Sequence, residues 1–248
     1  MIDSSDFNFS GRRILITGAA GGIGSAMAAA FAAHGGEVIL ADIATENLAE
    51  QADVLGNGAS FLRYDQSDSA SIATLATAAG PVDIFCNNAG MMQAGAFLEQ
   101  SPEIIARMIT VDLTGPILLA RYIGEGMVAR GSGVIVNTAS QLAFHGAAYR
   151  TAYATAKAGI VQFTKSAAAE LAPHGVRVVA LAPGRTLTAM NAPLLATEEQ
   201  RAEGLKQIPA GRYGDREEMA KLALFLASDA ASYVVGETLV ADGGYVLL

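Results

Sequence analysis

A tyrosine and a lysine with the chemistry for proton transfer, Tyr153 and Lys157, lie four residues apart. Residues at this spacing share one face of a helix, and the alanine-rich sequence that continues to about Leu171 predicts a helix. A phenol is a poor base at neutral pH because its ordinary pKa is about 10, but a nearby ammonium group favours the phenolate and lowers that pKa. The pair therefore predicts a general acid and base, although two residues at this spacing are by themselves a weak signal.

A serine could complete this arrangement. Ser140 lies thirteen residues before Tyr153 and follows the apolar run 134–138. We expect that run to form a buried strand with Ser140 at its end. The serine hydroxyl could then hydrogen-bond the oxygen of a substrate whose proton Tyr153 exchanges.

A glycine-rich turn near the N-terminus has the composition of a phosphate-binding loop. Gly18, Gly22 and Gly24 follow the apolar run 13–17, and helical periodicity begins at about Ile23. Gly18 would let the chain turn sharply, Gly22 would let a pyrophosphate approach the backbone, and Gly24 would let the helix pack closely on the sheet. The N–H groups and dipole of that helix would face the phosphates. A purely structural turn is the alternative, which the position between a strand and a helix disfavours.

An acidic residue at the end of the second expected strand indicates which dinucleotide is bound. Asp42 follows the apolar run 37–41 and could accept hydrogen bonds from both hydroxyls of the adenosine ribose. It would also repel a 2′-phosphate, since two unit charges about 4 Å apart repel by about 4 kcal/mol at an effective dielectric constant of about 20. No lysine or arginine lies between Gly18 and Gly24 to attract that phosphate. The sequence therefore predicts that the protein binds NAD rather than NADP. The alternative role of Asp42 is to cap a helix.

The elements that must position these residues alternate between short apolar runs and segments of helical periodicity. The expected strands are 13–17, 37–41, 82–86, 134–137, 176–182 and 238–240. Helix starts are predicted by three capping patterns: Ser101 with Pro102, Thr197 with Gln200, and Asp215 with Glu218. Alternation of this kind requires parallel strands joined by right-handed crossovers. We therefore predict a single α/β domain, residues 1–248, in which a Rossmann-type doubly wound parallel sheet lies between two layers of helices.

Composition limits the classes of function. The chain has 248 residues, a net charge of −8 and no cluster of basic residues, which disfavours binding to nucleic acid. Residues 1–10 lack the pattern of a signal peptide, and no apolar stretch reaches the roughly 18 residues of a membrane span. The single cysteine, Cys86, cannot form an intrachain disulfide, and we interpret it as a core residue. We expect a cytoplasmic protein that binds no membrane and no metal.

Together these motifs resemble the short-chain dehydrogenase/reductase family over nearly the whole chain, from about Gly11 to Leu248. The resemblance implies that Ser140, Tyr153 and Lys157 are catalytic, that Tyr153 exchanges the proton, and that Lys157 also binds the nicotinamide ribose. It also implies cofactor contacts in segments whose residue types alone are not informative. These are Asp65 and Gln66 beside the adenine, Asn88, Ala89 and Gly90 in the segment 87–90, and Pro183, Gly184 and Thr188 beside the nicotinamide amide, with the family's C-terminal signature at 242–244.

One residue departs from the family pattern in a way that concerns the chemistry. Many members have an asparagine in the segment 111–115, where it helps to hold a water of a proton relay behind the lysine, and here the position is Asp112. A carboxylate accepts hydrogen bonds but cannot donate an amide N–H. We include Asp112 among the catalytic residues and expect a changed pH profile. Val179 also replaces a common asparagine, which we interpret as a change in packing.

The loops around the predicted site should contact the substrate. The candidates include Gln93, Gln141, His145, Arg150 and Arg185, with Met190 in an expected lid over about 185–212. Arg150 lies three residues before Tyr153, where hydroxy-acid dehydrogenases of the family can have a basic residue, so it could bind a carboxylate in two-pronged geometry. A solvent-facing or subunit-contact Arg150 and a structurally bonded His145 are the alternatives. Sugars or polyols, hydroxy acids and small ketones all stay open as substrates.

The motifs together predict an enzyme, an NAD(H)-dependent oxidoreductase that interconverts a secondary alcohol and a ketone. Oxidation of the alcohol is the leading direction, and biosynthetic reduction of a ketone is the alternative within this class. A non-catalytic dinucleotide sensor is the alternative of another class, which the complete Ser–Tyr–Lys set disfavours. The resemblance implies a homotetramer, and the small residues along 152–172 would allow close packing of subunits.

Overall fold

A single parallel sheet forms the centre of the molecule. The computed structural model describes residues 4–188 and 197–247, and within them seven strands pair in the order β3-β2-β1-β4-β5-β6-β7. The strands are β1 (Arg13–Thr17), β2 (Glu37–Asp42), β3 (Ser60–Arg63), β4 (Ile84–Asn87), β5 (Gly133–Thr138), β6 (Val176–Pro183) and β7 (Thr238–Ala241). Every pairing is parallel, which confirms the predicted Rossmann-type fold.

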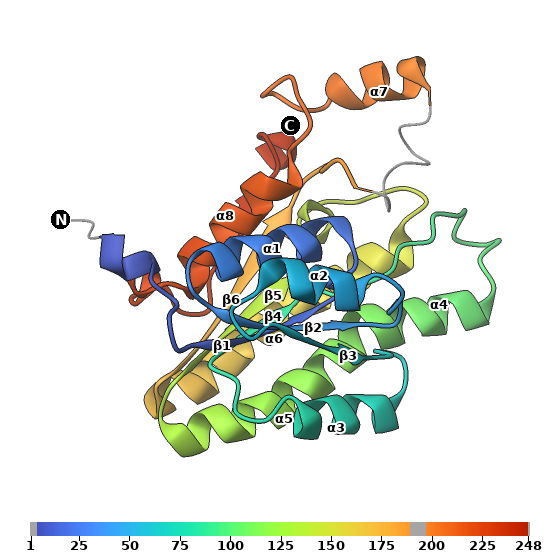
Figure 1. Ribbon diagram of the computed structural model, residues 1–248. Helices are drawn as coiled ribbons and strands as arrows, with labels where there is room; N and C mark the ends of the chain where they lie inside the picture. The colour runs from blue at the N-terminus through green and yellow to red at the C-terminus, as the bar shows by residue number, and fades with distance from the viewer. Residues whose placement is uncertain (1–3, 189–196, 248) are drawn as a thin grey trace.

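Helices cover both faces of this sheet (Figure 1). They are α1 (Gly22–Ala33), α2 (Leu48–Leu55), α3 (Ser69–Ala78), α4 (Pro102–Ile109), α5 (Gly115–Arg130), α6 (Thr151–Leu171), α7 (Glu198–Leu205) and α8 (Arg216–Ala227). The side chains of α1, α2 and α8 fill one core cluster, and those of α3, α5 and α6 fill a second on the opposite face. Helix α7 lies apart from both layers, next to the C-terminal segment (Figure 1).

The predicted capping patterns are present at the helix starts. Ser101 accepts the N–H of Ile104 at 3.4 Å at the start of α4. Thr197 and Gln200 form a reciprocal capping box on α7. At α8, the carboxylate of Glu218 accepts the N–H of Asp215 at 2.9 Å. Local sequence is sufficient for these helix starts because the cap satisfies backbone N–H groups that have no partner inside the helix.

Strand β3 is an element that the sequence did not reveal. Its four residues are mostly exposed, because it lies at the edge of the sheet and pairs with β2 alone. The apolar runs that mark β1, β4 and β6 reflect burial on both faces of the sheet, which β3 does not have. Cys86 is buried in the core, as predicted, and Val179 is buried in the same cluster.

The register brings three segments to the same edge of the sheet. Thr17 pairs with Ala41, and Ile16 pairs with Cys86. The glycine turn after β1, Asp42 at the end of β2 and the loop after β4 therefore leave the sheet together at its carboxyl edge. In open α/β sheets this edge binds ligands where the strand order reverses, which here is between β1 and β4.

Candidate active site

A cleft of about 630 Å³ opens at this edge of the sheet. Most of the residues predicted to bind cofactor or substrate line it. They are Gly18, Gly22, Ile23, Gly24, Asp42, Asn88, Ala89, Gly90, Ser140, Gln141, Arg150, Tyr153, Lys157, Pro183, Gly184, Arg185 and Thr188. Residues far apart in the chain therefore meet in one cavity.

The glycine turn lies tightly against the loop after β4. Gly18 has a φ of +67°, and a Cβ there would lie 2.8 Å from the Cα of Ala89. A Cβ on Gly24 would collide with the carbonyl oxygen of Gly18. Asn88 holds the two segments together, because its backbone N–H donates to the Thr17 hydroxyl at 3.0 Å. The turn can keep this shape only with glycine at these positions, which leaves its backbone open to phosphate oxygens.

Asp42 stands in the cleft beside this turn. Its carboxylate accepts the N–H of Ala20 at 3.0 Å and that of Ala44 at 3.0 Å. These bonds orient the carboxylate where the adenosine ribose of a dinucleotide would lie. A glycine cradle with an acidic residue at the next strand end fits a dinucleotide, and the residues that would hold it are those of the turn, Asp42 and the loop 88–90.

Ser140, Tyr153 and Lys157 converge at the inner end of the cleft. Tyr153 lies in the first turn of α6, and Ser140, which follows β5, is close enough for its side chain to lower the pKa of Tyr153. The Nζ atom of Lys157 lies 5.7 Å from the centre of the Tyr153 ring and donates to the carbonyl oxygen of Thr138 at 3.0 Å. The spacing of four residues thus places both side chains in one cavity, as the sequence predicts.

The pKa of Tyr153 does not follow the sequence prediction. Burial raises this pKa above its ordinary value, and the effect of burial exceeds the lowering by Lys157 and by the Ser140 hydrogen bond. The negative charge of Asp112 raises it further. Lys157 acts in the expected direction, but desolvation of the phenolate by burial is the larger effect.

Asp112 lies behind Lys157 and does not line the cleft. It is fully buried in a π-helical turn, Thr110–Thr114, between α4 and α5. Its Oδ1 atom lies 3.4 Å from Lys157 Nζ and accepts the N–H of Met91 at 3.2 Å, while Oδ2 has no hydrogen-bond partner within the described residues. Burial raises the pKa of Asp112, and the charge of Lys157 opposes that rise.

Four predicted contacts lie outside the cleft lining. Asp65 accepts hydrogen bonds from the N–H and the hydroxyl of Ser67, which lower its pKa. Gln66 is buried, and its amide donates to the carbonyl oxygens of Ala89 and Val111, so it supports the cofactor loop from behind. Gln93 is exposed. His145 packs against Tyr245, with ring centres 5.0 Å apart. Met190 lies outside the described residues.

The structure adds cleft residues that no local pattern predicted. Tyr245, near the C-terminus, and Gln207, after α7, both line the cleft, and the Tyr245 hydroxyl donates to Gln207 Oε1 at 3.3 Å. The only sequence signal for Tyr245 was its position just after the segment 242–244. Thr138 and Thr186 also line the cleft.

Two structural features are absent from the described residues, 4–188 and 197–247. These residues contain no group of three or more His, Cys, Asp or Glu side chains that could hold a metal ion. None of their helices combines the length and the apolar character needed to cross a membrane.

The fold and the cleft define the class of the protein. A parallel sheet with a glycine turn after β1, and a serine, tyrosine and lysine set beside it, is the framework of a dinucleotide-dependent oxidoreductase acting on alcohol or carbonyl carbons. Residues 18–246 match the family model described as enoyl-(acyl carrier protein) reductase. The chain belongs to the short-chain dehydrogenase/reductase family.

Three similar proteins indicate the range of this family. A cis-4-hydroxycyclohexanecarboxylate dehydrogenase from Sinomonas cyclohexanicum is 40% identical, covering 96% of this chain and 97% of its own. An NAD-dependent glycerol dehydrogenase from Listeria innocua is 37% identical, covering 98% and 96%. A solved structure of a candidate NAD(P)-dependent gluconate 5-dehydrogenase from Beutenbergia cavernae, with NADP at low occupancy, has a TM-score of 0.94 and 39% identity, covering 98% of this chain and 100% of its own.

Proposed function

We propose that this protein is an NAD(H)-dependent dehydrogenase that interconverts a secondary alcohol and a ketone, with Tyr153 as the general acid and base. The observation that carries the proposal is the convergence of Ser140, Tyr153 and Lys157 in the cleft that also contains the glycine turn. Proton transfer and dinucleotide binding are thereby available within one cavity.

Each residue has a distinct part in the proposed reaction. When bound, the nicotinamide takes up or supplies the hydride. During oxidation the Tyr153 phenolate accepts the hydroxyl proton, and the hydroxyl of Ser140 donates a hydrogen bond to the substrate oxygen. Lys157 stabilises the phenolate through its positive charge. Asp112 places a negative charge on the buried side of Lys157. Because it acts through Lys157 and not directly on the substrate, it is a positioning residue.

The preference for NAD rests on Asp42. Its carboxylate is already fixed by two backbone N–H groups, so it cannot turn away easily from a 2′-phosphate. The name of the Listeria relative supports NAD, whereas the Beutenbergia structure contains NADP. Measuring kcat/KM for NAD and NADP with one substrate tests the preference, and a ratio in favour of NADP would contradict it.

We propose a substrate class and a direction of reaction from the names of the similar proteins. The names of the similar proteins include a polyol, a sugar acid and a hydroxy acid, which supports oxidation of a small polar alcohol. Reduction of a ketone is the second candidate, since the family model is described as a reductase. Sugars, polyols and hydroxy acids assayed with NAD, and ketones assayed with NADH, distinguish the two.

The Tyr153→Phe substitution tests the proposed role of the phenol. It should lower kcat by about 10²-fold or more, because the proton can no longer be transferred. The Kd for NADH, measured by fluorescence, should change little. Turnover equal to that of the parent protein would refute the role of Tyr153. Binding of NADH without turnover of any substrate in the panel would favour a non-catalytic sensor.

Three further expectations extend the proposal. We propose a homotetramer in which α6 packs on a second subunit, supported by exposed small residues such as Ala158, and light scattering of the purified protein tests it. We propose that the described parts of the expected lid, 185–188 and 197–212, cover the substrate, supported by the presence of Arg185 and Gln207 in the cleft lining. We propose a cytoplasmic location, supported by a single cysteine whose burial raises its pKa to about 12.

A further inference from the structure

The substrate end of the cleft contains positive charge that forms no ion pair with an acidic side chain of the described residues. Four charged residues line the cleft: Asp42, Arg150, Lys157 and Arg185. Asp42 lies at the ribose end, and Lys157 faces the buried Asp112. Neither Arg150 nor Arg185 forms an ion pair with any residue of the described ranges. Two unpaired guanidinium groups therefore remain in the cleft of a chain whose net charge is −8.

Contacts from two distant segments hold Arg185 in place. Its Nη2 atom donates to Gln207 Oε1 at 2.7 Å, and the guanidinium carbon lies 5.3 Å from the centre of the Tyr245 ring. The Tyr245 hydroxyl donates to the same Gln207 oxygen. A neutral amide and an aromatic ring can orient a guanidinium without cancelling its charge. The guanidinium group is thus oriented by contacts within the chain.

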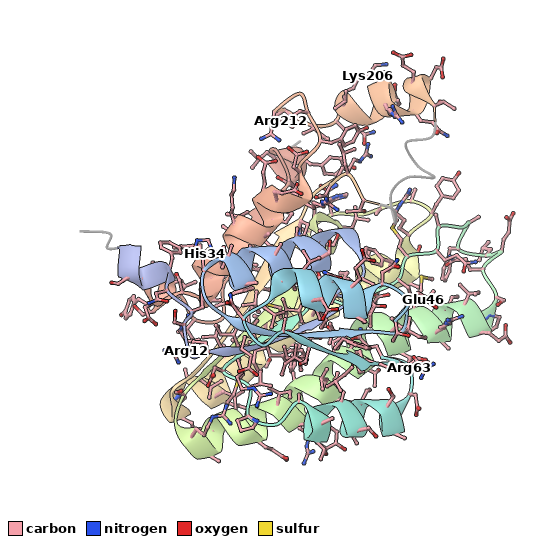
Figure 2. The ribbon with its side chains drawn as sticks, in the orientation of Figure 1. Arg12, His34, Glu46, Arg63, Lys206 and Arg212 are labelled. Carbon is pink, nitrogen blue, oxygen red and sulfur yellow. The ribbon has the colours of Figure 1, made fainter. Side chains whose placement is uncertain are left out.

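By contrast with Arg185, two nearby basic residues pair with acidic side chains. Lys206 lies 2.7 Å from Glu203, and Arg212 lies 2.6 Å from Glu218. Figure 2 shows both at the end of the molecule that carries α7. Lys206 and Arg212 are exposed and each has an acidic partner. Arg185 lines the cleft and has no acidic partner within the described residues. Charge left unpaired in a cavity favours an anionic ligand.

We propose that the substrate carries a carboxylate and that Arg185, oriented by Gln207 and Tyr245, binds it. Arg150, whose Nη1 atom donates to the carbonyl oxygen of Ala148 at 3.2 Å, adds a second positive charge to the same cleft. An arginine matches a carboxylate through two parallel N–H donors. The inference rests on the proposed function, since it assigns the substrate class of the cleft that contains Tyr153.

Calorimetric titration in the presence of NADH tests this proposal without requiring turnover. The probes are pairs that differ only in the charged group: gluconate with sorbitol, and 4-hydroxycyclohexanecarboxylate with its primary amide. The parent protein should bind at least one acid more tightly than its neutral partner. Arg185→Gln should raise the Kd for that acid about tenfold or more, because a charge-assisted bond is lost. It should raise the Kd for the neutral partner less than threefold. Arg185→Lys should recover part of the loss.

The controls separate this role from others. Arg12→Gln removes an exposed arginine that Figure 2 shows far from α7, and it should leave every affinity unchanged. Equal weakening of acid and neutral probes by Arg185→Gln would mean that Arg185 only anchors the segment around Gln207, and would overturn the proposal. So would a parent protein with no preference for any acid. Failure of the proposed function is recognised separately, by NADH binding without turnover of any alcohol or ketone.

Discussion

Replacing Asp112 by asparagine removes a buried negative charge beside Lys157 while keeping the shape of the side chain. The asparagine oxygen can still accept the N–H of Met91, and Lys157 keeps its bond to the Thr138 carbonyl oxygen. The change therefore acts mainly on electrostatics. Because the charge of Asp112 raises the pKa of Tyr153, its removal should lower that pKa.

The distances set the magnitude. Asp112 Oδ1 lies 3.4 Å from Lys157 Nζ, which lies 5.7 Å from the Tyr153 ring centre, so the carboxylate is at most about 9 Å from that centre. Two unit charges about 9 Å apart interact by about 2 kcal/mol at an effective dielectric constant of about 20. Since about 1.4 kcal/mol corresponds to one pKa unit, the midpoint of the pH profile should move by about one pH unit.

The assay is kcat/KM against pH in both directions. Oxidation needs the phenolate, so its rate rises as pH passes the pKa of Tyr153, whereas reduction needs the neutral phenol and its rate falls there. In Asp112→Asn both midpoints should move to lower pH by the same amount. Asp68→Asn is the matched control, because it removes an exposed carboxylate at the start of α3 and asparagine also caps helices.

A thermal unfolding curve must accompany these profiles, because removing one partner of a buried ion pair can destabilise a protein by about 3–5 kcal/mol. A folded Asp112→Asn protein with the parent pH profile in both directions would refute the reasoning. Asp112 would then be uncharged in the working enzyme or electrostatically uncoupled from Tyr153. A shift to higher pH would show that the sign assigned to its charge is wrong.

Three further substitutions test the cofactor site and the fold. Asp42→Ala should lower the ratio of kcat/KM for NAD to that for NADP by about tenfold or more, because the repulsion of a 2′-phosphate is lost; an unchanged ratio would exclude Asp42 as the determinant. Gly18→Ala should weaken NADH binding about tenfold in fluorescence titrations, since its φ of +67° and its contact with Ala89 exclude a Cβ; parent affinity would contradict the cradle. Asp68→Ala should lower the free energy of unfolding by about 1 kcal/mol in urea, because Asp68 accepts the Ala70 N–H at 2.9 Å, whereas Asp68→Asn should not.

Several features of the site could be predicted because they depend on short stretches of chain. The glycine turn is encoded by residues 18–24, where the path of the backbone itself requires glycine. The common orientation of Tyr153 and Lys157 follows from the pitch of a helix. The parallel fold follows from alternating apolar runs and helical segments, since parallel strands need crossover connections.

Other features depended on contacts across the whole molecule. The edge strand β3 has no apolar run, because its place in the sheet leaves it exposed. Gln66 supports the loop at Ala89 rather than lining the cleft, which depends on how that loop and the turn Thr110–Thr114 come together around its amide. The association of Arg185 with Gln207 and Tyr245 joins segments that no spacing rule relates.

The sequence by itself determined the fold class, and it identified the glycine turn and the Ser140, Tyr153 and Lys157 set that meet in one cleft. The tertiary structure decided the electrostatics of those residues: the pKa of Tyr153 is raised, because burial outweighs the neighbouring lysine, and Asp112 lies where its charge adds to that rise. Spacing along a helix fixes which side chains are neighbours. The removal of water around them depends on every segment that packs over the site, and desolvation is the largest influence on the charged form of the phenol.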